Sequence, residues 1–124
     1  MERRKFNKTL IASFGALGIS HSLLGNKFLH SNSKKLGIAL VGLGSYASKQ
    51  LAPALLETSL CELKAIVTGT ASKIPQWKKT YGLNDNQVYN YQNFDSIINN
   101  PEVDIVYVVL PNNMHKEYTI RAFK

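Results

Sequence analysis

The sequence predicts an α/β fold, a doubly wound parallel sheet, and three observations support this prediction. An apolar strand over 36–41 leads directly into a glycine-rich turn. Apolar, β-branched segments then alternate with segments of helical pattern, as in sheets whose parallel strands are joined by right-handed helical crossovers. The segment 103–110 is almost continuously apolar, which is typical of a strand buried on both faces of a parallel sheet. A chain of 124 residues has room for about one such domain.

The turn after the first strand has the spacing of a dinucleotide-binding motif, Gly42-x-Gly44-x-x-Ala47. Gly42 permits a tight turn, Gly44 leaves the backbone open to a diphosphate, and Ala47 lets the next helix pack closely on the sheet. A helix predicted over 46–57 would direct free backbone N–H groups toward the phosphates, and Pro53 should kink it or mark its second turn. A purely structural strand-to-helix turn remains the alternative.

The second unit combines a strand over 63–68 with a helix over 72–81. Gly69 ends the strand, Pro75 suits the first turn of the helix, and Gly82 closes it. We therefore expect a second parallel strand followed by its crossover helix.

The end of this second strand bears on the choice of dinucleotide. NAD-selective folds place an acidic residue there to hold the adenine ribose, and Glu62 stands at the opposite end of the strand. Thr70, Ser72 and Lys73 instead offer hydroxyls and an ammonium where a 2′-phosphate would lie. This pattern favours NADP, with NAD as the alternative. The hydroxyls could also merely cap the next helix while Lys73 is solvated.

A third unit is predicted as a short strand over 88–91 and a helix over 94–99, with Asn93 as its cap and Pro101 as its stop.

The long apolar strand over 103–110 leads into a helix over 112–124. Asn112 and His115 then lie at the carboxyl edge of the sheet, beside the glycine-rich turn, where ligands of such sheets bind. Asn112 can cap the helix, and His115 can face either the crevice or the solvent.

The first 30 residues predict a twin-arginine-like signal segment, followed by a linker over 31–35. Arg3 and Arg4 precede an aromatic residue, a lysine and a mildly apolar stretch that is too short and polar to span a bilayer stably. Export by this route, which carries folded proteins, would place the protein in the periplasm. A cytoplasmic location is the alternative. A clear cleavage site is absent from the sequence, and an amphipathic helix packed on the domain is the other interpretation.

Charge and cysteine content argue against several functions. More than half of the net charge of +7 lies in the first 30 residues, and the rest lacks a basic stripe interleaved with aromatics, so nucleic acid is not an expected partner. Cys61 is the single cysteine, so neither an intrachain disulfide nor a Cys/His metal spacing is available. Paired carboxylates or a nucleophile–histidine arrangement that would supply another chemistry are also absent from the sequence pattern.

Taken together, the motifs resemble those of the Gfo/Idh/MocA oxidoreductase family, and within it the glucose–fructose oxidoreductases. The resembling segments are 39–47, 67–69, 81–82, 91–95, 103–107 and 110–115. The resemblance covers about 36–124 and implies an NADP-binding Rossmann domain. It also implies a further α/β domain that holds a sugar or polyol substrate and mediates a homo-oligomer.

The resemblance also implies three groups of cofactor-binding residues. Those at the diphosphate are Gly42, Gly44, Tyr46 and Ala47, with Ser45 among them; those around the adenine ribose are Thr68, Gly69, Thr70 and Lys73; those toward the nicotinamide are Leu110, Pro111, Asn112 and His115.

Family members carry a Glu-Lys-Pro motif with a catalytic lysine after a helix equivalent to 112–124, and this sequence ends before it. We therefore expect no catalytic residue in this chain, and expect it to be the inactive front part of a longer oxidoreductase. A non-catalytic dinucleotide-binding sensor or interaction module is the alternative. A fold that binds S-adenosylmethionine is less favoured, because it too needs an acidic residue after the second strand.

Overall fold

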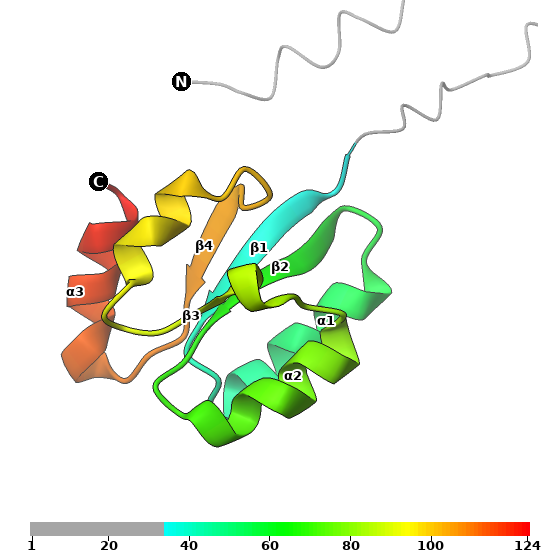
Figure 1. Cartoon of the computed structure of the whole chain (residues 1–124), viewed down its shortest axis with the longest axis horizontal. Helices are drawn as coiled ribbons and strands as arrows, with labels where there is room; N and C mark the ends of the chain where they lie inside the picture. Colours follow the sequence, from blue (N-terminus) through cyan, green and yellow to red (C-terminus); the bar gives the residue numbers. More distant parts are fainter. Residues whose placement is uncertain (1–33) are drawn as a thin grey trace, which may run out of the picture. The chain divides into compact units, whose positions relative to one another are not determined.

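The computed structural model describes residues 34–124, which form one parallel sheet with helices on both faces (Figure 1). The predictions of a signal segment over 1–30 and of most of the linker over 31–35 lie outside the described residues. The strands are β1 (Leu36–Val41), β2 (Cys61–Val67), β3 (Val88–Tyr89) and β4 (Ile105–Val108). Their order is β3-β2-β1-β4, and every neighbouring pair is parallel. The predicted Rossmann-like α/β architecture is confirmed.

Helical segments connect these strands. They are the π-helical turn η2 (Ala47–Leu51), α1 (Ala52–Glu57), η3 (Ala71–Lys73), α2 (Ile74–Tyr81), η4 (Asp85–Gln87), η5 (Phe94–Asn99) and α3 (Asn112–Ala122), where η3, η4 and η5 are 3₁₀ turns. In Figure 1, α1 and α2 lie on one side of the sheet, and η5 and α3 lie on the other.

Alternating side chains of the central strands pack into two separate cores, one on each face of the sheet. Ala39 and Val41 of β1 pack toward η5 and α3, whereas Leu40 packs toward α1 and α2. This alternation follows from the two-residue period of a strand, and burial on both faces explains why β1 is uniformly apolar. The same two-sided burial holds the carboxyl end of β1, from which the glycine-rich turn departs.

Strand β4 differs from the prediction in length and in burial. It spans Ile105–Val108, and Ile105 and Tyr107 are 39% and 44% exposed, so the predicted burial on both faces is wrong. The reason is its edge position, because no helix among residues 34–124 covers the face that carries these two side chains. Val106 and Val108 pack against the core on the other face.

The helix after the glycine-rich turn accommodates Pro53 by a π-helical turn. The Ala52 N–H donates to the Ala47 carbonyl, five residues back, and Pro53 then lies in the first turn of α1. Proline has no N–H and its ring excludes the carbonyl four residues before it, so a widened turn avoids both problems. The helix is therefore not broken at Pro53.

Helix ends were predicted with mixed success. Gly82 closes α2 in the left-handed conformation, with φ +66°, as expected. Asn93 stands at the predicted cap position before η5, but its side chain makes no cap hydrogen bond. The predicted cap at Asn112 is wrong, because Asn112 is the first residue of α3. The Asn93 side chain instead accepts a hydrogen bond from the Asn90 N–H at 2.7 Å, and Pro111 occupies the position before α3.

Candidate functional site

Three loops meet at the carboxyl edge of the sheet, because β2, β1 and β4 are adjacent and parallel. In the central loop, Gly42 has φ +96° and its N–H donates to the Val67 carbonyl at 2.9 Å. A Cβ atom on Gly42 would lie 2.5 Å from the Val109 carbonyl oxygen. Both the backbone conformation and this close approach therefore require glycine.

Gly44 has the opposite surroundings. A Cβ atom there would meet nothing within 4 Å, and its φ lies outside the left-handed range that favours glycine. The fold of residues 34–124 therefore does not explain a glycine at this position. An open backbone at the second glycine fits the space that a diphosphate needs.

The backbone after Gly44 turns directly into helix. Tyr46 already has helical angles, and the Ser48 N–H and hydroxyl both donate to the Gly44 carbonyl, at 3.0 and 2.9 Å. Within the described part of the chain, no group accepts a hydrogen bond from the N–H groups of residues 44–47. Such unpaired donors at a helix start are suited to an anion. Ala47 is fully buried, as the close-packing role predicted, whereas Ser45 and Tyr46 are exposed.

In the loop after β2, Thr68 and Gly69 have roles inside the protein. Thr68 is buried, and its hydroxyl accepts a hydrogen bond from the Thr70 N–H at 3.1 Å. A Cβ atom on Gly69 would lie 2.9 Å from the Tyr91 ring. Thr68 and Gly69 thus shape the loop, while the exposed Thr70 makes no side-chain cap to η3. Thr70 thus holds the cap position of η3, but its hydroxyl makes no cap hydrogen bond.

Lys73 joins this loop to the glycine-rich turn. Its Nζ donates to the Leu43 carbonyl oxygen at 2.7 Å, across 30 positions of sequence. The interpretation of Lys73 as merely solvated is therefore wrong. Glu62 pairs with Lys64 at 3.2 Å at the far end of β2, so the carboxyl end of β2 carries no acidic side chain.

The third loop, after β4, also contacts the turn. Leu110 is buried, and a Cβ on Gly42 would lie 2.8 Å from its Cδ2 atom. The Pro111 carbonyl accepts hydrogen bonds from the N–H groups of Met114 and His115, both at 2.9 Å, which starts α3. His115 is exposed, and its Nδ1 lies 3.3 Å from the Thr119 hydroxyl one turn along the helix.

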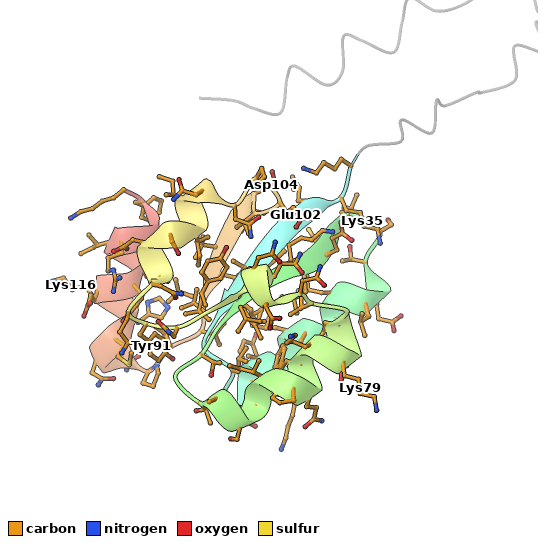
Figure 2. The ribbon with its side chains drawn as sticks, in the orientation of Figure 1. Lys35, Lys79, Tyr91, Glu102, Asp104 and Lys116 are labelled. Atoms are coloured by element: carbon orange, nitrogen blue, oxygen red, sulfur yellow. The ribbon has the colours of Figure 1, made fainter. Side chains whose placement is uncertain are left out.

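Tyr91, which the sequence pattern does not mark as a site residue, lies against the loop after β2. Its ring packs over Gly69, and its ring centroid lies 5.2 Å from that of Tyr118 on α3. Figure 2 labels Tyr91 near α3. Burial raises the pKa of the Tyr91 phenol above its ordinary value of 10.0. Its only sequence signal was its place in the 91–95 segment, because the contact with Gly69 spans two strands.

Residues 34–124 contain no group of three or more His, Cys, Asp or Glu side chains that could hold a metal ion. Over the same range, no helix has the length and apolar character needed to cross a membrane. Cys61 is a free, half-buried thiol.

Comparison with known proteins agrees with this geometry. Residues 36–124 match the family model GFO_IDH_MocA, described as an oxidoreductase family with an NAD-binding Rossmann fold. An uncharacterized oxidoreductase of Rhizobium meliloti is 26% identical over 83 residues, which are 67% of this chain and 24% of that protein.

Two solved structures are also similar. An aldose-aldose oxidoreductase from Caulobacter crescentus, complexed with glycerol, has a TM-score of 0.69 and 44% identity over 72% of this chain and 27% of that chain. A 3-ketoreductase from Actinomadura kijaniata, in complex with TDP-benzene and NADP, has a TM-score of 0.61 and 26% identity over 73% and 27% of the two chains. The chain thus spans about a quarter of the length of the relatives it matches.

Proposed function

The chain belongs to the Gfo/Idh/MocA oxidoreductase family, and we propose that residues 36–124 bind NADP in an enzyme that transfers hydride between the nicotinamide and a sugar or polyol. The observation that carries the proposal is the open side of Gly44, next to four backbone N–H groups that lack an acceptor among residues 34–124. A diphosphate beside Gly44 would satisfy these donors.

Each loop has a part in holding the dinucleotide. The amides from Gly44 to Ala47 bind the diphosphate, and Gly42 sets the turn that aims them. The exposed Thr70 and Lys73 face the adenine ribose, on a loop whose shape depends on Thr68 and Gly69. The segment from Leu110 through Pro111 and Asn112 to His115 lies along the path toward the nicotinamide. When bound, the nicotinamide ring supplies the hydride chemistry.

The preference for NADP rests on charge at the end of β2. A carboxylate there would accept hydrogen bonds from the ribose hydroxyls and repel a 2′-phosphate, and this loop has none. An ammonium has three N–H donors, and Lys73 donates one of them to the Leu43 carbonyl, so two remain for a phosphate. The NADP in the crystals of the 3-ketoreductase supports the same choice by similarity. NAD is the alternative.

The activity of the whole protein is an extension of this proposal. The aldose-aldose oxidoreductase supports a sugar or polyol substrate by its name and its 44% identity. We assign no catalytic residue to this chain, and expect the substrate site and the oligomer contacts in a further domain. We also propose that the first 30 residues direct export to the periplasm by the twin-arginine route, that 31–35 is a linker, and that the cofactor domain begins at Leu36.

Fluorescence titration of the chain with NADPH and NADH tests the proposal. We expect tighter binding of NADPH, and expect Thr70→Asp to weaken NADPH by about ten-fold or more while leaving NADH unchanged, because the new carboxylate repels the 2′-phosphate. Thr58→Asp is the matched control. Thr58 lies at the other end of β2, and a carboxylate can keep the hydrogen bond that its hydroxyl accepts from the Leu60 N–H. Equal affinities of the unmodified chain for both nucleotides would refute the NADP assignment.

A further inference from the structure

We propose that Lys73 is a positioning residue for the glycine-rich turn, which holds the Gly44 amide in place for either dinucleotide, with or without a 2′-phosphate. The inference rests on the proposed function and deepens it. Lys73 ends η3 and stands at the cap position of α2, whereas Leu43 lies between the two glycines of the turn. Their 2.7 Å hydrogen bond therefore links two of the three loops of the site.

The Leu43 carbonyl belongs to the same peptide unit as the Gly44 N–H. This unit is planar and trans, so its C=O and N–H point in opposite directions. A cation that holds the Leu43 oxygen on one side consequently directs the Gly44 N–H to the other side. The Gly44 N–H is one of the donors proposed for the diphosphate, so the ammonium orients a binding group that it does not touch.

Few other contacts fix this peptide unit. Before it, the Gly42 N–H bonds to the Val67 carbonyl, and after it the Gly44 carbonyl accepts two hydrogen bonds from Ser48. The bonds from Ser48 are local, within four residues. Within the described range, the long-range hydrogen bond to the Leu43–Gly44 peptide itself therefore comes from Lys73. The buried Leu43 side chain anchors the same residue in the core beside α1 and α2.

Charge also favours this placement of Lys73. A cation at the start of α2 is disfavoured by the helix dipole. Among residues 34–124, no ion pair joins Lys73 to a carboxylate. The Leu43 carbonyl is an acceptor that relieves this cost. Because the ammonium keeps two further donors, holding the turn and binding a 2′-phosphate are compatible.

The test compares Lys73→Met and Lys73→Arg in the whole chain. Lys78→Met is the matched control, because Lys78 lies on α2, the helix that begins directly after Lys73, and pairs with Asp85 rather than with the turn. Fluorescence titration gives the affinities for NADH and NADPH. We expect Lys73→Met to weaken NADH by roughly five- to ten-fold, through loss of a charge-assisted hydrogen bond, and to weaken NADPH by more. Lys73→Arg should restore NADH binding, and Lys78→Met should change neither affinity.

NMR order parameters of the backbone amides, measured without nucleotide, give an independent readout. Lys73→Met should lower the order parameter of the Gly44 amide relative to the strand amides of β1, while the urea midpoint stays close to that of the unmodified chain. Unchanged NADH affinity together with weakened NADPH would overturn the proposal and leave Lys73 as a phosphate ligand alone. If the unmodified chain bound neither nucleotide, the proposed function would fail, and an unchanged order parameter at Gly44 would separately refute the positioning role.

Discussion

At the amino end of the sheet the polar groups are paired with one another, whereas at the carboxyl end several backbone donors have no acceptor among residues 34–124. Asp104 bonds to Gly37 twice at the amino end: its carboxylate accepts from the Gly37 N–H, and its own N–H donates to the Gly37 carbonyl, both at 2.8 Å. Lys64 pairs with Glu62 and Glu102 at the same end. Figure 2 shows Glu102 and Asp104 at the opposite end of the sheet from Tyr91.

The carboxyl end contrasts with this in both glycine use and hydrogen bonding. At Gly37 an added Cβ would collide with the Glu102 carbonyl, whereas at Gly44 it would meet nothing within 4 Å. The fold therefore explains Gly37, whereas Gly44 would be explained by the proposed diphosphate site. The comparison teaches that polar groups at the amino end of the sheet are paired within the domain, while the carboxyl end leaves backbone donors available for the proposed cofactor.

The largest expected effect is at the amino end. Gly37→Ala should destabilise the domain by about 2–3 kcal/mol, because the new Cβ displaces the Glu102 backbone from β1. Urea unfolding measures this loss. Gly44→Ala is the matched control and should change the free energy of unfolding by less than about 1 kcal/mol. Equal losses at the two glycines would remove the contrast between the two ends.

A smaller effect is expected from the side chains of the same end. Buried Gln87 donates from Nε2 to the Glu102 carboxylate at 2.9 Å. Glu102→Ala leaves that donor unpaired, and we expect a loss of about 1–2 kcal/mol. Glu117→Ala is the control, because its contact with Arg121 is exposed and should contribute less than about 0.5 kcal/mol. If Glu102→Ala cost no more than its control, the paired groups at the amino end would not stabilise the fold.

The smallest effect concerns a pair on the face covered by α3. Arg121 donates two hydrogen bonds to Asp95, at 2.9 and 3.0 Å, and these lower the pKa of the Asp95 carboxyl from its ordinary value of 3.8. A lowered pKa in the folded state means that the pair stabilises above about pH 3.8, and that this contribution is lost as the pH falls through the folded-state value.

Unfolding of the unmodified chain and of Asp95→Asn, measured from pH 3 to pH 7, checks this expectation. The unmodified chain should be slightly more stable near pH 7, and the difference should vanish toward the acid end and shrink in high salt. A difference that grows as the pH falls would contradict the assignment.

The parts of the fold that the sequence predicted depend on local physics. The strand, turn and helix around Gly42 follow from apolar runs and glycine spacing, and the end of α2 follows from Gly82. The same local reasoning identified the absence of an acidic residue after β2. These features need no knowledge of what lies next to them in space.

The parts that it missed depend on neighbours. The exposure of Ile105 and Tyr107 is set by the edge position of β4, which the apolar pattern of 103–110 does not encode. The Asn93 side chain accepts a hydrogen bond from the Asn90 N–H rather than from the turn that follows. The bond from Lys73 to Leu43 joins positions 30 apart, so no local pattern could indicate it.

The most direct test of the central claim is urea unfolding of the unmodified chain and of Gly44→Ala, each with and without NADPH. At about 100 times the dissociation constant, NADPH should stabilise the unmodified chain by about 2.7 kcal/mol. Gly44→Ala should match the unmodified chain without nucleotide and gain little from NADPH, because its methyl group fills the space for the diphosphate. Equal stabilisation of both proteins by NADPH would contradict the claim that Gly44 is kept open for that group.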